Sequence, residues 1–363
     1  MALQSSGAIS LNEIHIEAGG SSGTTASIND SDIRDLIDKS SGATMSFNEW
    51  YGASAFTARW VGAGGGKRRS MQYVDIATLS NASDFGDMHF HNNGESRQLC
   101  GSCASITRGV YIGGNSNEAK ETLEYITIAS TGNGTDFGDC GNNYGSAGAS
   151  NDTRGVYMSN AYDMSEIEYI TIASTGDTQD FGNLAQSRLY PGSCASSTRA
   201  CVGGGFHGSN FGNLAQIDYI TTASLGNASD FGDLTIGRKY VNNGSMGSNT
   251  RGIFAGGHLG SEQPGVNGPN VVIDYITIAS TGNATDFGDC IEARFAAASG
   301  SSKTRALPRC GGYQSVAGAT LSTTMDYITI ASTGDASDFG DLIDGEQQWS
   351  GASNGCGGTS STS

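Results

Sequence analysis

Several short motifs in this 363-residue chain contain residue types that carry chemistry in other proteins. The triplet Asp-Phe-Gly occurs six times, beginning at Asp84, Asp136, Asp180, Asp230, Asp286 and Asp338. In kinases this triplet holds magnesium, but it works together with a glycine-rich loop, a lysine strand and a His-Arg-Asp motif, which this sequence lacks. The glycine run before Lys67 does not have the spacing of a phosphate-binding loop. We therefore expect no phosphoryl transfer.

Metal binding and nucleophilic catalysis are equally unsupported by the sequence. The turns rich in Asp and Asn lack the ladder of a calcium loop, and the five histidines form no Ser/His/Asp arrangement. Cys100 and Cys103 form a CxxC pair without a second pair at zinc spacing. The eight cysteines recur where other repeats carry Ala, Leu or Met, which is typical of small buried residues. The sequence predicts a non-enzymatic protein without metal or cofactor, and a glycan-processing enzyme is the least favoured alternative.

Each triplet is the end of a longer cassette, for example YITIASTGNATDFGDC. The cassettes begin at Tyr73, Tyr125, Tyr169, Tyr219, Tyr275 and Tyr327. The step from the tyrosine to the Asp of the triplet is always 11 residues, whereas the cassettes themselves recur at intervals of 44 to 56 residues. A period near 50 with strand-like content is typical of a β-propeller.

Six cassettes predict six blades, each of four strands labelled A to D from the axis outward. Strand A must consist of small residues because inner strands converge on a narrow channel, and GSCAS, GSAGAS, GSCASS, GSMGSN, AASGSS and SGASNG fit that place. The first blade has a B strand at Arg59–Ala63 but no A strand before it, and 349–356 resembles an A strand with nothing after it. We therefore predict an all-β, six-bladed propeller closed by its C-terminal strand, which would hide the last open edge.

One face of the predicted propeller is constant. Every B strand begins with an arginine, at Arg59, Arg108, Arg154, Arg199, Arg251 and Arg305. These arginines and the Asp residues of the six triplets belong to the same face, because the A–B and C–D turns share it. The sequence thus predicts a structural ring of Arg–Asp pairs, which could fix the register of the blades.

The opposite face varies, because its B–C loops differ in length. The longest loops are 203–216, 257–272 and 312–325. They carry the candidate ligand-binding residues Phe206, His207, Phe211, His258 and Tyr313, which we expect at exposed loop tips. Recognition often uses variable loops on a rigid scaffold. The alternative is sequence drift in solvent-exposed loops.

The first 54 residues contain no cassette, so the predicted domains are 1–54 and 55–363. Capping boxes at Ser10–Glu13 and Ser46–Glu49 and an apolar pattern at Ser31–Asp38 predict short helices. A segment of this size has a marginal core, which suggests that it docks on a partner. The net charge of −17 disfavours nucleic-acid binding. Without a secretion signal or a long apolar stretch, we expect production in a reducing cytoplasm and no membrane insertion.

Two resemblances cover almost the whole chain. Residues 1–54 resemble the N-terminal segment of virion structural proteins of tailed marine cyanobacterial phages, through ISLNEIHIEAGG, SINDSDIRDLI and SGATMSFNEWYGAS. The remainder is similar to Kelch repeats, through TRGVYIGG, EYITIAS and the downstream arginines Arg97, Arg188, Arg238 and Arg294. The repeats depart from Kelch in a longer C–D turn, in Phe where Trp is usual, and in Ser159-Asn160 where Gly-Gly is expected.

These resemblances imply a phage virion structural protein, made in the host cytoplasm and present in multiple copies on the particle. The first 54 residues would attach it to other virion proteins, as in a tail fibre or tail-associated protein. The propeller would then bind the host surface, through a glycan or a protein. The alternative is a capsid or tail decoration or scaffold protein whose propeller mediates only subunit packing.

Overall fold

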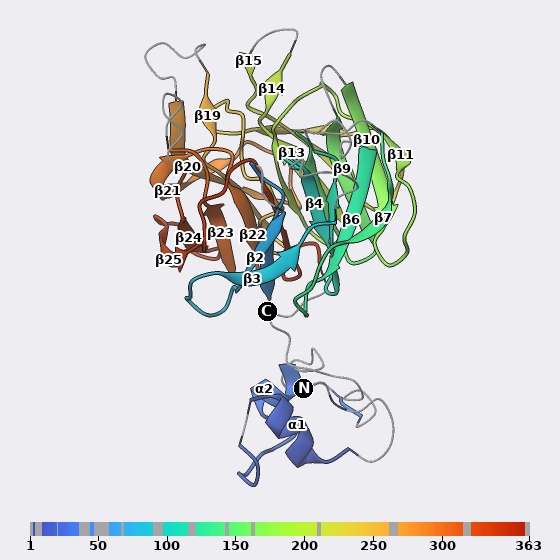
Figure 1. The fold of residues 1–363 in the computed structure, drawn as a ribbon, viewed down its shortest axis with the longest axis vertical. Coiled ribbons are helices and arrows are strands. Elements are labelled where there is room, and N and C mark those ends of the chain that lie inside the picture. The colour runs from blue at the N-terminus through green and yellow to red at the C-terminus, as the bar shows by residue number, and fades with distance from the viewer. Residues whose placement is uncertain are drawn as a thin grey trace. The chain divides into compact units, whose positions relative to one another are not determined.

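The computed structural model describes residues 3, 9–19, 21–35, 44–46, 58–66, 69–89, 97–114, 121–141, 145–160, 164–208, 212–260, 268–314 and 321–359. The chain divides into two compact units, Met1–Thr57 and Ala58–Ser361 (Figure 1). The boundary predicted from the sequence, after residue 54, lies outside the described residues.

The first unit contains two short helices, α1 (Leu11–Glu17) and α2 (Ser31–Asp35). The predicted capping box is confirmed, because the Ser10 hydroxyl accepts from the Glu13 amide and the Glu13 carboxylate accepts from the Ser10 amide. The helices share a small core, in which Ile14 and Ile33 are fully buried. The predicted box at Ser46–Glu49 lies largely outside the described residues.

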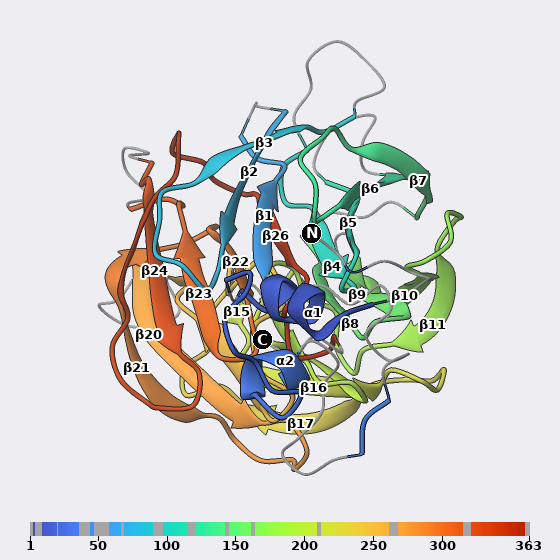
Figure 2. The same ribbon diagram turned by 90° about the horizontal axis from the view of Figure 1, so that it is seen from below.

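The second unit is a six-bladed β-propeller, as the cassettes predict (Figure 2). From the axis outward, the first three blades are β26 (Ser350–Ser353), β1 (Arg59–Ala63), β2 (Ser70–Asp75), β3 (Ser83–Asp87); β4 (Gly101–Ala104), β5 (Arg108–Ile112), β6 (Thr122–Thr127), β7 (Thr135–Asp139); and β8 (Ala147–Ser150), β9 (Arg154–Asn160), β10 (Met164–Thr171), β11 (Gln179–Asn183). The fourth and sixth are β12 (Gly192–Ala195), β13 (Arg199–Gly203), β16 (Gln216–Thr221), β17 (Ser229–Asp233); and β22 (Ala298–Ser301), β23 (Arg305–Cys310), β24 (Thr324–Thr329), β25 (Ser337–Asp341).

The fifth blade departs from the prediction. It contains β18 (Arg251–Ala255), β20 (Gly268–Thr277) and β21 (Thr285–Arg294), with the short β19 (His258–Leu259) beside β20. The expected inner strand GSMGSN is not a regular strand and is joined to β18 only through the bridge between Gly247 and Gly252. Gly244 and Gly247 have φ values of 137° and 151°, which interrupt an extended strand. A further hairpin, β14 (Phe206–His207) and β15 (Gly212–Asn213), lies in the B–C loop of the fourth blade.

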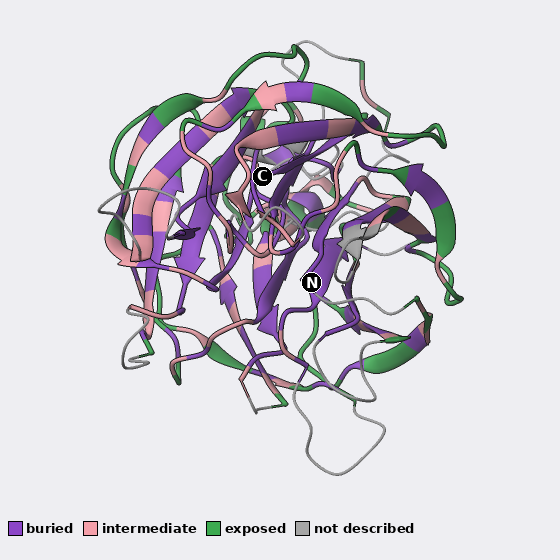
Figure 3. Ribbon diagram, turned by 90° about the horizontal axis from the view of Figure 1, so that it is seen from above, coloured by how far each residue is buried: buried purple, intermediate pink, exposed green. Residues whose placement is uncertain are grey.

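The predicted closure by the C-terminal strand is confirmed. β26 pairs antiparallel with β1, with Val61 opposite Ala352. The inner strands are buried along their whole length, whereas the outer strands combine exposed, half-buried and buried residues (Figure 3). The small residues of the inner strands have a steric cause, since a side-chain carbon at Gly148 would overlap the Ser102 carbonyl of the preceding blade. The hydrophobic core lies between blades; Val61 and Phe85 of the first, for example, pack with Ile126 of the second.

The constant length of the cassette comes from a contact between blades. In each blade, the Asp or Asn that follows the triplet donates its backbone N–H to the side-chain oxygen of an Asn or Asp in the C–D turn of the next blade. These six bonds are 2.9–3.1 Å long and form a closed ring through Asn133, Asp177, Asn227, Asn283, Asp335 and Asn81. The triplet glycine lies against the same turn, and a side chain at Gly232 would overlap the Gly282 carbonyl. We call these contacts the turn clasp.

The six B-strand arginines form a ring, but their partners are not the triplet aspartates. Each guanidinium stacks on the cassette tyrosine of its own blade, 4.4–4.7 Å from the ring centroid. Each also donates to backbone carbonyls in the next blade, from Arg59 to Ala129 in the first blade through to Arg305 and Ala77 in the last. Among the described residues no ion pair joins these arginines to the triplet aspartates. The prediction of an Arg–Asp ring is therefore wrong, because the arginines form a ring but pair with tyrosine rings and backbone carbonyls and not with the triplet aspartates.

Candidate functional site: a cup at the mouth of the channel

Four buried ion pairs support the face of the propeller opposite the C–D turns. Each joins an arginine of a D–A connection to the acidic residue that precedes a cassette tyrosine. The pairs are Arg97–Glu124 (3.1 Å), Arg188–Asp218 (2.6 Å), Arg238–Asp274 (2.8 Å) and Arg294–Asp326. Burial raises the pKa of Asp218 and Asp326, and the paired arginine opposes that rise. These four arginines, on which the resemblance to Kelch repeats partly rests, thus tie the D–A connections to the C strands.

These arginines also fix the bases of the variable loops. Arg188 donates to the carbonyls of Gly204 and Gln216, the two ends of the long loop of the fourth blade. Arg294 donates in the same way to Gly311 and Thr324 in the sixth blade. The loops therefore vary in length above a base of constant geometry.

Two residues after each of these arginines, the backbone enters the left-handed region. The equivalent positions of the six blades are Leu99 (φ 59°), Gly145 (72°), Tyr190 (59°), Tyr240 (53°), Ala296 (55°) and Gln348 (55°). Four backbone hydrogen bonds of 2.6–2.8 Å link five of them in a row, from Tyr190 through Gly145, Leu99 and Gln348 to Ala296. Non-glycine residues adopt this conformation rarely, which marks these positions as constrained by their surroundings.

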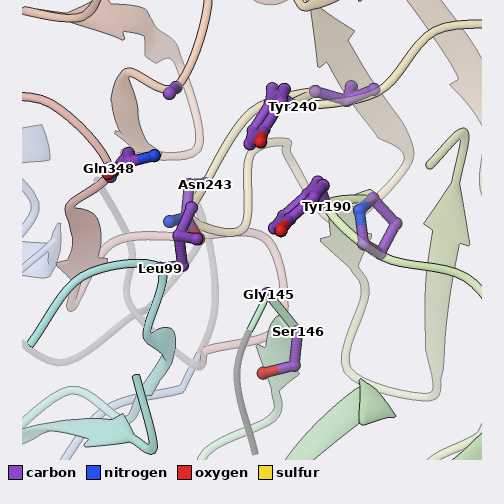
Figure 4. Close-up of a pocket in the computed structure, with 10 residues that line it drawn as sticks. Leu99, Gly145, Ser146, Tyr190, Tyr240, Asn243 and Gln348 are labelled. Atoms are coloured by element: carbon purple, nitrogen blue, oxygen red, sulfur yellow. The ribbon is translucent and has the colours of Figure 1, made fainter. Parts of the chain in front are cut away.

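These six residues line a small cavity at the mouth of the channel, which we call the cup. Its lining also includes Ser146, Pro191, Val241 and Asn243. The hydroxyl groups of Tyr190 and Tyr240 are turned toward the space bounded by Asn243 and Ser146 (Figure 4). None of the ten lining residues carries a charged side chain. The Ser146 side chain is buried, and its hydroxyl has no hydrogen-bond partner among the described residues.

Three of the five candidate loop residues meet the rim of the cup. Phe206, His258 and Tyr313 occupy equivalent positions and pair with Leu189, Lys239 and Phe295 through isolated two-bond bridges. They therefore lie at the bases of the loops, next to Tyr190, Tyr240 and Ala296, and not at exposed tips as expected; His258 is only 8% exposed. His207 follows on β14 and is half-buried, and Phe211 lies outside the described residues.

The rim carries a continuous row of aromatic rings, which we call the aromatic row. Tyr190 stacks on Tyr240 at 4.2 Å, Tyr240 packs against Phe295 at 5.6 Å, and Phe295 stacks on Tyr313 at 5.1 Å between centroids. At its edges, His258 meets Phe295 edge-on, and the Lys239 ammonium lies 4.6 Å from the ring centroid of Phe206.

Only part of this site was predicted from the sequence. The prediction named aromatic residues of the variable loops but not Tyr190, Tyr240 and Phe295, which are on the short D–A connections. The sequence does contain a pattern that points to these connections. In four blades the left-handed residue stands two positions after the arginine of the D–A connection, in Arg97-x-Leu99, Arg188-x-Tyr190, Arg238-x-Tyr240 and Arg294-x-Ala296.

The opposite end of the channel is covered by the C-terminal tail. Residues 354–359 are buried, and side chains at Gly357 and Gly358 would overlap carbonyl oxygens of Ser248, Ala195 and Ser150, from three different blades. Gly355 contacts one more blade, the sixth, at Ser302. The cup thus has a floor of inner strands, with the tail across the far end.

No protein-family model and no curated protein matches this chain. Among the described residues no group of three His, Cys, Asp or Glu side chains gathers as a metal site would require. Neither helix in the described part of the chain is long and apolar enough to cross a membrane.

Proposed function

We propose that this protein is a non-enzymatic structural component of a phage virion, such as a tail fibre or tail-associated protein. The first unit attaches it to the particle, and the propeller recognises the host surface through the cup and the aromatic row. The observation that carries this proposal is the convergence of three variable loops and three connections on one aromatic rim. Half-buried aromatic rings surrounded by variable loops are typical of recognition surfaces.

The two faces of the propeller support a division of labour. The face that contains the A–B and C–D turns, which we call the cassette face, is occupied by the turn clasp and the arginine ring. These contacts hold the blades together. The chain enters the propeller at Ala58, directly before Arg59 of that ring, and so on the cassette face. The cup face is therefore the one that does not carry the connection to the first unit.

Recognition without catalysis fits the chemistry of the cup. General acid–base catalysis needs a titratable group near the reacting atoms, most often His and in other cases Asp, Glu, Lys, Tyr or Cys. Among the residues that line the cup, the only such groups are the phenols of Tyr190 and Tyr240; the others are apolar, amide or hydroxyl side chains. Such a lining suits hydrogen bonding and stacking.

Attachment by the first unit rests on the resemblance of its sequence and on its small core. Only Leu3, Ile14 and Ile33 are buried apolar residues among its described positions. A unit with so little buried surface gains stability when it docks on a partner.

A particle-adsorption experiment tests the proposal. Replacing Phe206 and Tyr313 by Ala should lower adsorption to host cells about tenfold or more, the loss expected for interface aromatics that contribute ~1.4 kcal/mol or more. The matched control replaces Leu79 and Leu225, which are 52% and 58% exposed in the C–D turns of the cassette face, by Ala. Control particles should adsorb normally. Normal assembly and unchanged adsorption of the Phe206/Tyr313 variant would instead support the scaffold alternative.

A further inference from the structure

We infer that Cys194 and Cys201 form a modification site, at which an oxidant converts two thiols of the folded propeller into a disulfide across the inner hairpin of the fourth blade. Both cysteines are free thiols and 0% exposed in the structure. The inference concerns the scaffold and does not depend on the proposed function.

The register of the hairpin brings the two cysteines together. β12 and β13 are antiparallel, and Cys194 stands directly opposite Cys201. Directly opposite residues of an antiparallel pair have their side chains on the same face of the sheet. Both cysteines belong to one hydrophobic core cluster, and burial and a hydrogen bond to the Cys201 thiol raise the pKa of Cys194. The two thiols are therefore immediate neighbours.

The separation of the two backbones suits a disulfide. The Ser196 amide donates to the Arg199 carbonyl at 2.8 Å, so these two residues are a hydrogen-bonded pair at the turn. Because such pairs alternate along antiparallel strands, Cys194 and Cys201 are the next hydrogen-bonded pair, with Cα atoms about 5.5 Å apart. Disulfides join Cα atoms that are about 4.4–6.8 Å apart. The two strands are thus already at disulfide distance.

The pairing of two thiols is particular to the fourth blade. No other register of the described strands places a cysteine opposite a cysteine. The equivalent inner and second-strand residues of the first three blades are Ala352 and Val61, Cys103 and Val110, and Ala149 and Val156. The second blade therefore carries a single thiol where the fourth carries two.

A disulfide at this position would hold an inner strand at an irregular part of the ring. β12 has four residues and pairs within its sheet only with β13. Toward the fifth blade it meets the irregular inner segment, where the Met246 amide donates to the Ser193 carbonyl at 3.3 Å. The Cys194 sulfur also occupies the space that a side chain at Gly252 would need. The covalent bond would thus keep β12 on β13 beside an inner segment that is not a regular strand.

The chemistry is a two-electron oxidation. The S–H bonds of Cys194 and Cys201 break, one S–S bond forms, and two protons and two electrons pass to the oxidant. Molecular oxygen becomes hydrogen peroxide in this reaction, and the azo bond of diamide becomes a hydrazine. Because both sulfur atoms are buried, the oxidant reaches them when the short β12 strand opens locally, which makes the reaction slow. A reducing cytoplasm keeps such a pair in the dithiol form.

Peptide mapping tests the inference, because trypsin cleaves after Arg199, between the two cysteines. The folded full-length protein is treated with diamide, free thiols are blocked with N-ethylmaleimide, and the digest is analysed by mass spectrometry. We expect peptides 189–199 and 200–238, which contain one cysteine each, to be joined by a disulfide that dithiothreitol breaks. Absence of this linked peptide, or its appearance only when the protein is unfolded before oxidation, would overturn the inference.

Cys194→Ala and Cys201→Val are the matched variants, because other blades carry Ala and Val at these positions. Neither variant should yield the linked peptide. Oxidation should raise the midpoint of thermal unfolding of the wild type by about 2–5 °C, since the bond constrains the unfolded chain, and should leave both variants unchanged. An equal shift in the variants, or linkage of Cys194 to a different cysteine, would also overturn the inference.

Discussion

Arginine side chains occupy three different environments in the propeller. Six stack on the cassette tyrosines, and four are buried in ion pairs beneath the cup. Arg309 belongs to neither set: it is fully buried, its guanidinium nitrogens have no hydrogen-bonded oxygen acceptor among the described residues, and it interacts with the Cys290 thiol. Its neighbours include the Cys290 thiol, whose pKa burial raises to about 11, and burial lowers the pKa of Arg309 itself. The same residue type therefore stabilises or strains the fold according to its partners.

Arg294 and Arg309 offer a matched comparison, since both are 0% exposed and both are near Asp326. Arg294→Met should lower the free energy of unfolding by about 3–5 kcal/mol, because it leaves the buried carboxylate of Asp326 without its ion pair. Arg309→Met should raise it by about 1–3 kcal/mol, because it removes an unsatisfied buried charge. Urea unfolding of both variants measures the difference. A large loss of stability in Arg309→Met would show that Arg309 is needed to neutralise Asp326.

At this scale the sequence predicted which residues recur but not which ones meet. It placed the B-strand arginines and the triplet aspartates on one face, which is correct, and paired them, which is wrong. Neighbouring residues of a strand point to opposite sides. The aspartate before each buried triplet phenylalanine is therefore exposed, as at Asp84 before Phe85. The arginine instead covers the cassette tyrosine, whose ring packs edge-on against that phenylalanine.

The cassette is the element that carries the architecture. Its six copies predicted the number of blades from the sequence, and the inner-strand segment 349–356, with no blade after it, predicted the closure. The turn clasp explains that constancy, since an insertion in the C–D turn would move the clasp residue away from the neighbouring blade. The irregular inner segment of the fifth blade was not predictable from composition alone. Apart from Met246 its residues are as small as those of the other inner strands, and its backbone differs at Gly244 and Gly247.

A truncation series separates closure of the ring from covering of the channel. Ending the chain after Gly345 removes β26 together with Trp349, which is fully buried and lies 5.3 Å from the ring of Trp60. Burying a large apolar side chain contributes roughly 1.5–3 kcal/mol, so loss of the strand and this side chain should cost several kcal/mol and broaden thermal unfolding. Ending it after Ser353 removes only the tail and should cost less.

The full-length chain is the control for this series. Thermal unfolding followed by circular dichroism gives all three midpoints. A chain ending at Gly345 that melts with the control would contradict closure by β26.

For the whole molecule, the repeats separate a face that assembles the propeller from a face that is free to diverge. Every blade contributes the same clasp and arginine contacts on the cassette face, whereas the six left-handed positions at the cup carry five different residue types. Six-fold repetition thus yields an asymmetric cup face, with aromatic rings concentrated on the fourth, fifth and sixth blades. The sequence predicted this division of faces, but the cup itself forms only when short connections from six blades meet at the axis.

Binding of the fluorescently labelled full-length protein to host cells tests most directly the proposal that the cup face recognises the host surface. We predict saturable binding that falls about tenfold or more in the Phe206/Tyr313 variant. The Leu79/Leu225 control should bind like the wild type. Binding that is unchanged in the Phe206/Tyr313 variant would contradict recognition by the cup face.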